Sequence, residues 1–142
     1  MEKETLKRIF DFLEKKENKN APFKWKLIFN EPLTKEELTI DGDLDLAFSQ
    51  ITSLPEGLHV MGNLDLSSTN ITSLPEGLFV WGNLSLSDCK KITRLPEGLK
   101  VELNLYIGDT LLQRYEDEDL IEMVKPSDDI NGYIKGKISR NW

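Results

Sequence analysis

Apolar residues or glycine fall on every second position from 58 to 66, in the order Leu, Val, Gly, Leu and Leu. A period of two predicts an extended segment with one face turned inward and the other outward. The segment that leads into this pattern recurs with a nearly identical sequence: ITSLPEGL occupies 51–58 and 71–78, and ITRLPEGL occupies 92–99. A repeat of 20 or 21 residues is typical of a solenoid, in which successive rungs stack on one another.

Degenerate copies extend the array on both sides and predict about four rungs between residues 38 and 114. Within a rung, the alternation ends where the chain turns, and Pro75 and Gly77 mark a corner before the next rung starts at Leu78. The fold class we expect is an α/β solenoid dominated by β-strand. Matching inward side chains of successive rungs then form the core.

The residues before the array predict a cap. Apolar residues at helical spacing indicate an amphipathic helix over about 3–17, which covers the first rung or binds a partner. Alternating aromatic and basic residues predict a strand over 23–29 against that rung.

The residues after the array predict a second cap. An acidic stretch indicates a short helix over about 116–125, and 133–138 predicts a short final strand that lies against the last rung and closes that end. The whole chain, 1–142, is expected to be a single domain, with an N-terminal helix and strand over 1–37, the repeats over 38–114 and the C-terminal cap over 115–142.

The segment Leu64-Asp65-Leu66-Ser67-Ser68-Thr69-Asn70-Ile71 resembles the core of the leucine-rich repeat family, Leu-x-Leu-x-x-(Asn, Thr or Cys)-x-Leu. The LPEGL corner is similar to the short repeats of bacterial and bacteriophage proteins. This resemblance covers roughly half of the chain. It implies a bacterial or bacteriophage protein whose strand faces bind another protein, and a lid at the C-terminal end.

Composition narrows the class of partner. The net charge is −7, from 25 acidic and 18 basic residues, which disfavours nucleic acid as a ligand. One cysteine excludes an internal disulfide and fits a reducing compartment. No apolar run approaches the roughly 20 residues needed to span a bilayer. We expect a protein of the cytoplasm, or of the host cytoplasm if it is encoded by a phage, with no membrane partner.

Outward residues at equivalent positions of stacked rungs form columns. Two neighbouring columns place His59, Met61, Phe79 and Trp81 together, and exposed Trp and Phe residues on a sheet are typical of interfaces. These four side chains either bind a partner or are covered by the protein's own caps. Both alternatives remain open from the sequence.

Other columns are small and polar, and they include Asp45, Asp65 and Tyr106. Asp41, Asp43 and Asp45 alternate along one segment, so a weak cation site is conceivable, although a solvated acidic face is favoured. Three glutamates also stack at the corners, where we expect each to accept backbone hydrogen bonds in its turn. They are Glu56, Glu76 and Glu97.

No catalytic arrangement is apparent. His59 is the one histidine and faces outward, whereas Cys89 occupies an inward position at the bend of its rung. The sequence contains no nucleophile and base pair, phosphate loop or metal-binding pattern, so we expect neither enzymatic activity nor a cofactor.

The first hypothesis is a non-catalytic protein-binding module, with monomer the favoured oligomeric state and a protein partner of unknown identity. The alternatives are an acidic inhibitor that imitates a nucleic-acid backbone, as in phage counter-defence, and a structural subunit of a larger assembly. The candidate partner-binding residues are His59, Met61, Phe79, Trp81, Asp45, Asp65 and Tyr106.

Overall fold

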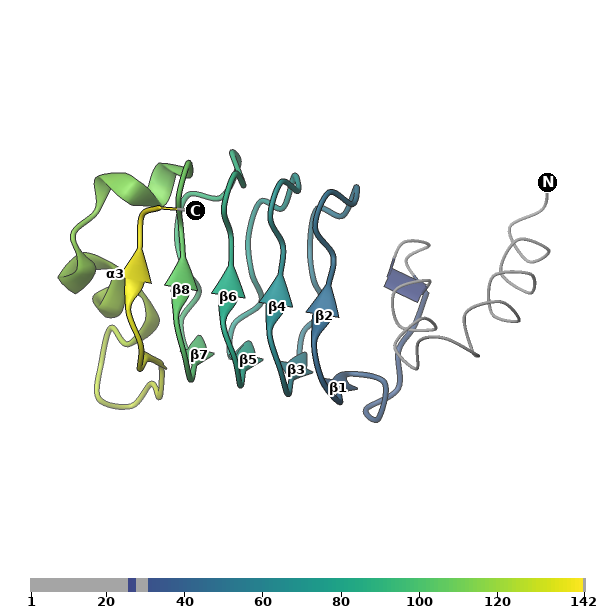
Figure 1. Cartoon of the computed structure of the whole chain (residues 1–142). Coiled ribbons are helices and arrows are strands. Elements are labelled where there is room, and N and C mark those ends of the chain that lie inside the picture. The colour runs from purple at the N-terminus through teal and green to yellow at the C-terminus, as the bar shows by residue number, and fades with distance from the viewer. Residues whose placement is uncertain (1–25, 28–30, 142) are drawn as a thin grey trace.

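A computed structural model describes residues 26–27 and 31–141, and within them the chain winds into a β-solenoid of stacked parallel strands (Figure 1). Three regular turns of 20, 20 and 21 residues lead from Thr39 to His59, Phe79 and Lys100. The predicted solenoid is therefore confirmed, and its turns have the period of the sequence repeat.

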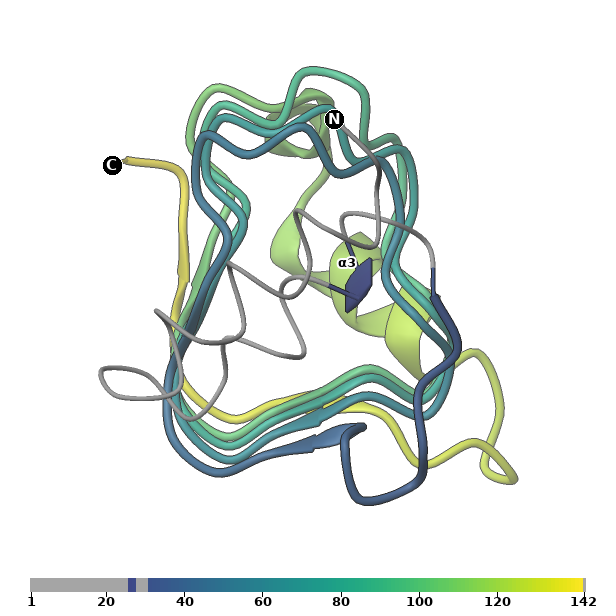
Figure 2. The same cartoon turned by 90° about the vertical axis from the view of Figure 1, so that its right-hand side faces the viewer.

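Each rung contributes two short strands to two separate five-stranded parallel sheets. Sheet A consists of β1 (Thr39–Ile40), β3 (His59–Val60), β5 (Phe79–Val80), β7 (Lys100–Val101) and β9 (Tyr133–Ile134). Sheet B consists of β2 (Leu44–Asp45), β4 (Leu64–Asp65), β6 (Leu84–Ser85), β8 (Leu105–Tyr106) and β10 (Ile138–Ser139). Viewed along the stack, the two sheets are adjoining sides of the coil (Figure 2).

The segment over 58–66 is thus not one continuous strand, because the chain bends at Gly62 between β3 and β4. A β-carbon at Gly62 would lie 2.4 Å from Oδ1 of Asp43 and 2.6 Å from the carbonyl carbon of Gly42. Only glycine lets neighbouring rungs approach this closely at the bend. The bend turns one alternating segment into two faces with different directions.

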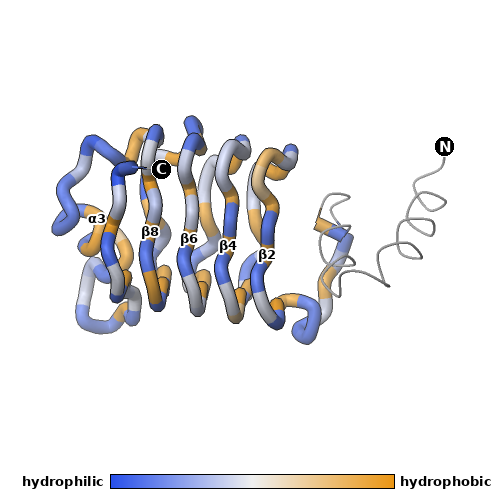
Figure 3. Tube along the Cα trace, in the orientation of Figure 1, coloured by the Kyte–Doolittle hydropathy of each residue, from blue (hydrophilic) through white to orange (hydrophobic). Residues whose placement is uncertain are grey.

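The core lies inside the coil and is almost entirely aliphatic. The leucines and valines of the strands, such as Leu64 and Val80, are fully buried, and the Ile and Leu of each ITSL segment fill the third side, which carries no strand. Because inward and outward residues follow one another along the chain, each rung carries both hydrophobic and hydrophilic residues (Figure 3). At the bend after sheet B, a short polar side chain bonds to the backbone, as in Thr69, whose hydroxyl donates to the Leu66 carbonyl at 2.8 Å.

Beyond β8 the chain forms a 3₁₀ helix, η1 (Leu111–Arg114), and an α-helix, α3 (Asp117–Val124), so the helix predicted over 116–125 is confirmed. Its first turn carries three acidic residues at the positive end of the helix. Leu120 and Val124 are buried, and the Val124 carbonyl accepts a hydrogen bond of 2.8 Å from the backbone N–H of Gly98. The helix therefore packs onto the end of the core.

The predicted final strand over 133–138 is instead two strands. β9 pairs with β7 in sheet A, and β10 pairs with β8 in sheet B. As predicted, this segment lies against the last rung, and it extends both sheets by a fifth rung because its backbone repeats the path of the rungs before it. The residues between β8 and β9 form η1 and α3 and do not follow the repeat, so the repeat does not predict this fifth rung.

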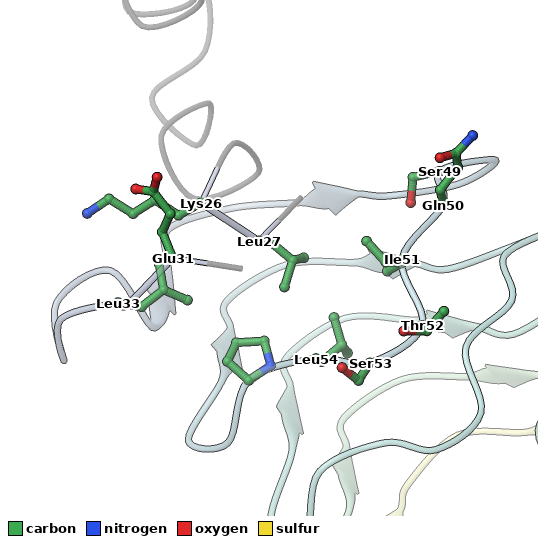
Figure 4. Close-up of a pocket in the computed structure, with 11 residues that line it drawn as sticks. Lys26, Leu27, Glu31, Leu33, Ser49, Gln50, Ile51, Thr52, Ser53 and Leu54 are labelled. Carbon is green, nitrogen blue, oxygen red and sulfur yellow. The ribbon is translucent and has the colours of Figure 1, made fainter. Parts of the chain in front are cut away.

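At the other end, the predicted helix over 3–17 lies outside the described residues, as does most of the predicted strand over 23–29. Lys26 and Leu27 are helical, so the strand prediction is wrong at these two positions. Leu27 packs against the core, and the Lys26 ammonium pairs with the Glu37 carboxylate at 2.6 Å. A cavity of about 760 Å³ separates this segment from the third side of the first rung, where Leu27, Ile51 and Leu54 line it (Figure 4).

Candidate interaction surface

The outward positions of sheet A form the columns that the repeat predicts. The register pairs His59 with Phe79, and Phe79 with Lys100, so that equivalent residues are direct neighbours on adjacent strands. A second column runs parallel to the first, two residues further along each rung. The first column is Thr39, His59, Phe79, Lys100 and Tyr133, and the second is Asp41, Met61, Trp81, Glu102 and Lys135.

Tyr133 and Lys135 belong to these columns through the fifth rung, which the repeat pattern alone does not predict. A signal was present, because the segment Tyr-Ile-Lys-Gly-Lys-Ile-Ser at 133–139 matches Phe-Val-Trp-Gly-Asn-Leu-Ser at 79–85 in residue type at every position except the third, where Lys135 replaces Trp81. The interruption by η1 and α3 hides this copy from a search for a fixed period.

The aromatic patch, which we define as His59, Met61, Phe79 and Trp81, occupies the middle of sheet A. The ring centroids of His59 and Phe79 are 5.6 Å apart, and those of Phe79 and Trp81 are 5.9 Å apart. Both pairs are tilted, a geometry in which aromatic rings attract one another. Trp81 nevertheless remains 53% exposed and Met61 42% exposed. The Phe79 ring contacts those of His59 and Trp81, and Trp81 and Met61 remain accessible to solvent.

The C-terminal end of sheet A is polar and internally paired. The Tyr133 hydroxyl donates a hydrogen bond to Glu102, and the Lys135 ammonium lies 2.8 Å from the same carboxylate. These partners, Lys135 first and Tyr133 second, hold the pKa of Glu102 below its usual value. The hydrogen bond to Glu102 raises the pKa of Tyr133 to about 12. The charges of this cluster largely satisfy one another.

The remaining candidates lie on sheet B, around the bend from the aromatic patch. Oδ1 of Asp45 accepts the backbone N–H of Ala47 at 3.0 Å, and Oδ1 of Asp65 accepts that of Ser67 at 2.9 Å. Both carboxylates therefore stabilise the turn that follows their strand. Tyr106 is partly buried in the same column. The structure thus places the seven candidate residues in two groups on two sides of the coil.

The column that begins with Asp43 is not an open polar surface but a chain of hydrogen bonds between rungs. The side-chain oxygen of each member accepts the backbone N–H of the next, at 2.7 Å from Asn63 to Asp43 and 2.7 Å from Asn83 to Asn63. The chain continues from Asn104 to Asn83 at 2.9 Å and from Lys137 to Asn104 at 2.8 Å. These side chains satisfy backbone groups at the bend and hold the rungs together.

The corner glutamates differ from the expectation. Glu56, Glu76 and Glu97 are exposed, and in the part of the chain that the structure describes their carboxylates make no hydrogen bond or ion pair. The predicted backbone hydrogen bonds are therefore absent. Each turn is instead stabilised by its glycine, as at Gly77, whose φ of +74° belongs to the left-handed region that side chains disfavour.

Cys89 points into the core as predicted, and its side chain is fully buried. Its thiol lies 3.0 Å from the Leu66 carbonyl, and burial raises its pKa. A protonated, inaccessible thiol is a poor nucleophile. Among residues 26–27 and 31–141, no three His, Cys, Asp or Glu side chains are grouped so that they could hold a metal ion.

None of the helices within the described residues is long and apolar enough to cross a membrane. Comparison with protein-family models, with curated proteins and with solved structures found no match.

Proposed function

We propose that this chain is a leucine-rich repeat protein that binds another protein through the aromatic patch on sheet A. The observation that carries the proposal is the exposure of Trp81 and Met61 beside a Phe79 ring that contacts both His59 and Trp81. Aromatic and methionine side chains supply much of the binding energy at protein interfaces. The protein acts by occupying a partner's surface, without chemistry.

The scaffold suits this role. Parallel pairing on both sides fixes the backbone of β3 and β5, so the patch changes little when a partner arrives. Binding to a preorganised surface loses less conformational entropy than binding to a flexible one. Assignment to the leucine-rich repeat family is supported by the turns of 20 and 21 residues and by the buried Thr69 and Cys89 at the bend of successive rungs.

The alternative of a nucleic-acid mimic has less support. Asp45 and Asp65 already accept backbone hydrogen bonds, and Lys90 pairs with both Asp88, at 3.0 Å, and Asp109, at 2.5 Å. A mimic needs rows of free carboxylates to replace phosphates. Many carboxylates of sheet B and of the turns beyond it are bonded internally, and the row that stays unpaired along the described part of the stack consists of the three corner glutamates, Glu56, Glu76 and Glu97.

The test is affinity capture with the full chain from a bacterial lysate, comparing wild type with Trp81→Ala. We expect Trp81→Ala to weaken binding of the captured protein by a factor of about 10 to 100, or about 2 kcal/mol. Circular dichroism should show an unchanged fold, since the Trp81 side chain is half exposed.

Phe48→Ala is the matched control, because Phe48 is also aromatic and 80% exposed but lies on the turn after sheet B. It should bind as wild type does. Equal capture by wild type and Trp81→Ala would remove the basis of the proposal.

A further inference from the structure

We propose that the partner presents a basic, apolar protein segment, whose apolar side chains lie on the aromatic patch while its Lys or Arg side chains meet the corner glutamates. This inference rests on the proposed function and adds the chemistry of the partner. Two observations support it: the unpaired corner glutamates lie in the turns that lead into sheet A, and a depression lies between the corners of two successive rungs.

The glutamates stand at the edge of sheet A because of the turn that leads into it. In the turn over 75–78, the Leu78 N–H donates to the Pro75 carbonyl at 3.3 Å, and the positive φ of Gly77 gives it the geometry of a type II turn. Glu76 is the residue before Gly77, at the exposed tip, and Phe79 follows three positions later. The same turn recurs at Glu97, so negative charge accompanies the aromatic patch along the stack.

The corners of two successive rungs also enclose a depression of about 340 Å³. Glu76 and Glu97 line it together with the partly exposed Pro96, whereas the lining residues Leu74 and Leu95 are buried in the core. Such a site suits a lysine or arginine, because these side chains pack their methylene stems against apolar surface and keep the charged head among polar groups. A carboxylate on each side matches that head.

Positive charge near the patch is limited. Arg94 lines the depression but forms no ion pair with either glutamate, and the Lys100 ammonium lies 3.5 Å from the Gly98 carbonyl. Lys135 is occupied by Glu102. A second copy of this chain is a poor occupant, because two identical faces would bring their unpaired carboxylates together. A basic segment instead gains from both the charges and the cation–π attraction of exposed Trp81.

The test uses three fluorescent 12-residue peptides in which Leu alternates with Lys, Glu or Ser, with binding to the full chain measured by fluorescence anisotropy. We expect the Leu/Lys peptide to bind at least about 10-fold more tightly than the other two. The triple variant Glu56→Gln, Glu76→Gln and Glu97→Gln should lose about 10-fold of this affinity.

The control variant Glu118→Gln, Glu122→Gln and Asp129→Asn makes the same change in net charge on exposed residues of the C-terminal cap. It should bind the Leu/Lys peptide within about 2-fold of wild type. An equal loss in both triple variants would mean that the overall acidity of the protein attracts the peptide, and the inference would fail. Failure of the Leu/Lys peptide to bind better than the others would also overturn it.

The two proposals can fail separately. If Trp81→Ala abolishes capture of a partner while the triple glutamate variant captures and binds as wild type does, the aromatic patch stands as an interface and the basic partner is wrong. If Trp81→Ala changes nothing, the proposed function fails first.

Discussion

Oδ1 of Asn63 accepts a hydrogen bond of 2.7 Å from the backbone N–H of Asn83, the equivalent residue one rung further along the stack. The two strands of each rung are only two residues long, so the sheets alone supply few hydrogen bonds at the bend between them. At the bend, the asparagine side chain supplies the hydrogen bond between rungs. This polar column is thus part of the scaffold.

Asn83→Ala should lower the free energy of unfolding by about 1 kcal/mol, because it leaves the backbone N–H of Asn104 without its acceptor. Urea denaturation measures the change. Asn70→Ala is the matched control, since Asn70 is exposed and its side chain makes no such bond. Equal stability of the two variants would mean that the column contributes nothing to stability.

Gly82→Ala should be more destabilising than Gly77→Ala. A β-carbon at Gly82 would lie 2.4 Å from Oδ1 of Asn63 and 2.9 Å from the backbone of Gly62, so the rungs would have to move apart, at about 2 kcal/mol or more. Gly77 has a φ of +74° but no heavy atom within 4 Å of the new carbon, which leaves conformational strain of about 1 kcal/mol. Thermal unfolding of both variants gives the order, and the reverse order would contradict the close stacking.

Tyr133 should ionise about two pH units above an ordinary tyrosine, because deprotonation breaks its hydrogen bond to Glu102. The pKa is raised on folding from 10.0 to about 12, so the stabilisation is complete below pH 10 and is lost as the pH rises through about 12. The 295 nm absorbance of wild type minus that of Tyr133→Phe isolates this group. A midpoint of the difference near pH 10 would show that the hydrogen bond is absent in solution.

Glu102 gives the opposite dependence at acid pH. Its pKa is lowered by Lys135 and Tyr133, so its contribution is present above the ordinary value of 4.5 and is lost as the pH falls through the lowered one. Glu102→Gln should therefore flatten the decrease in stability below pH 4.5 relative to wild type. Unfolding by urea at a series of pH values tests this, with the distant Glu118→Gln as the control.

Phe48→Gly should stabilise the protein by about 1 kcal/mol. Phe48 has a φ of +62°, which is strained for any residue with a β-carbon, and its side chain is 80% exposed and so contributes little packing. Glycine relieves the strain without removing a buried contact. Urea denaturation at pH 7 checks the sign, and a loss of stability would mean that Phe48 makes a contact in solution.

Much of the arrangement could be predicted from the repeat. The stacking of His59 beside Phe79, and of Met61 and Trp81 in the neighbouring column, follows from the identical spacing of successive rungs, and the register confirms it. The burial of Leu64 follows from the alternation, and that of Cys89 follows from its position at the bend, where the preceding rung has Thr69. These features depend only on which residues recur at which interval.

Other features depend on contacts between rungs, and the predictions from the sequence were wrong for two of them. The corner glutamates were expected to bond to their own turns, but the backbone there is stabilised by Gly57, Gly77 and Gly98, which leaves the carboxylates exposed. The acidic column at Asp45 and Asp65 was grouped with the aromatic patch, whereas the bend at Gly62 turns the two onto different sides. A linear pattern contains spacing but not the angle between consecutive strands.

By itself, the sequence determined the period, the inward and outward faces, and the identity of neighbours in each column, because a repeated chain can bury its apolar residues only by stacking them. The tertiary structure decided that each rung bends into two sheets, that Asn63 and its equivalents bond across rungs, and that the segment over 133–139 completes a fifth rung. Those outcomes follow from how closely glycine lets two backbones approach and from which backbone groups then need a partner, and both arise only once the rungs are in contact.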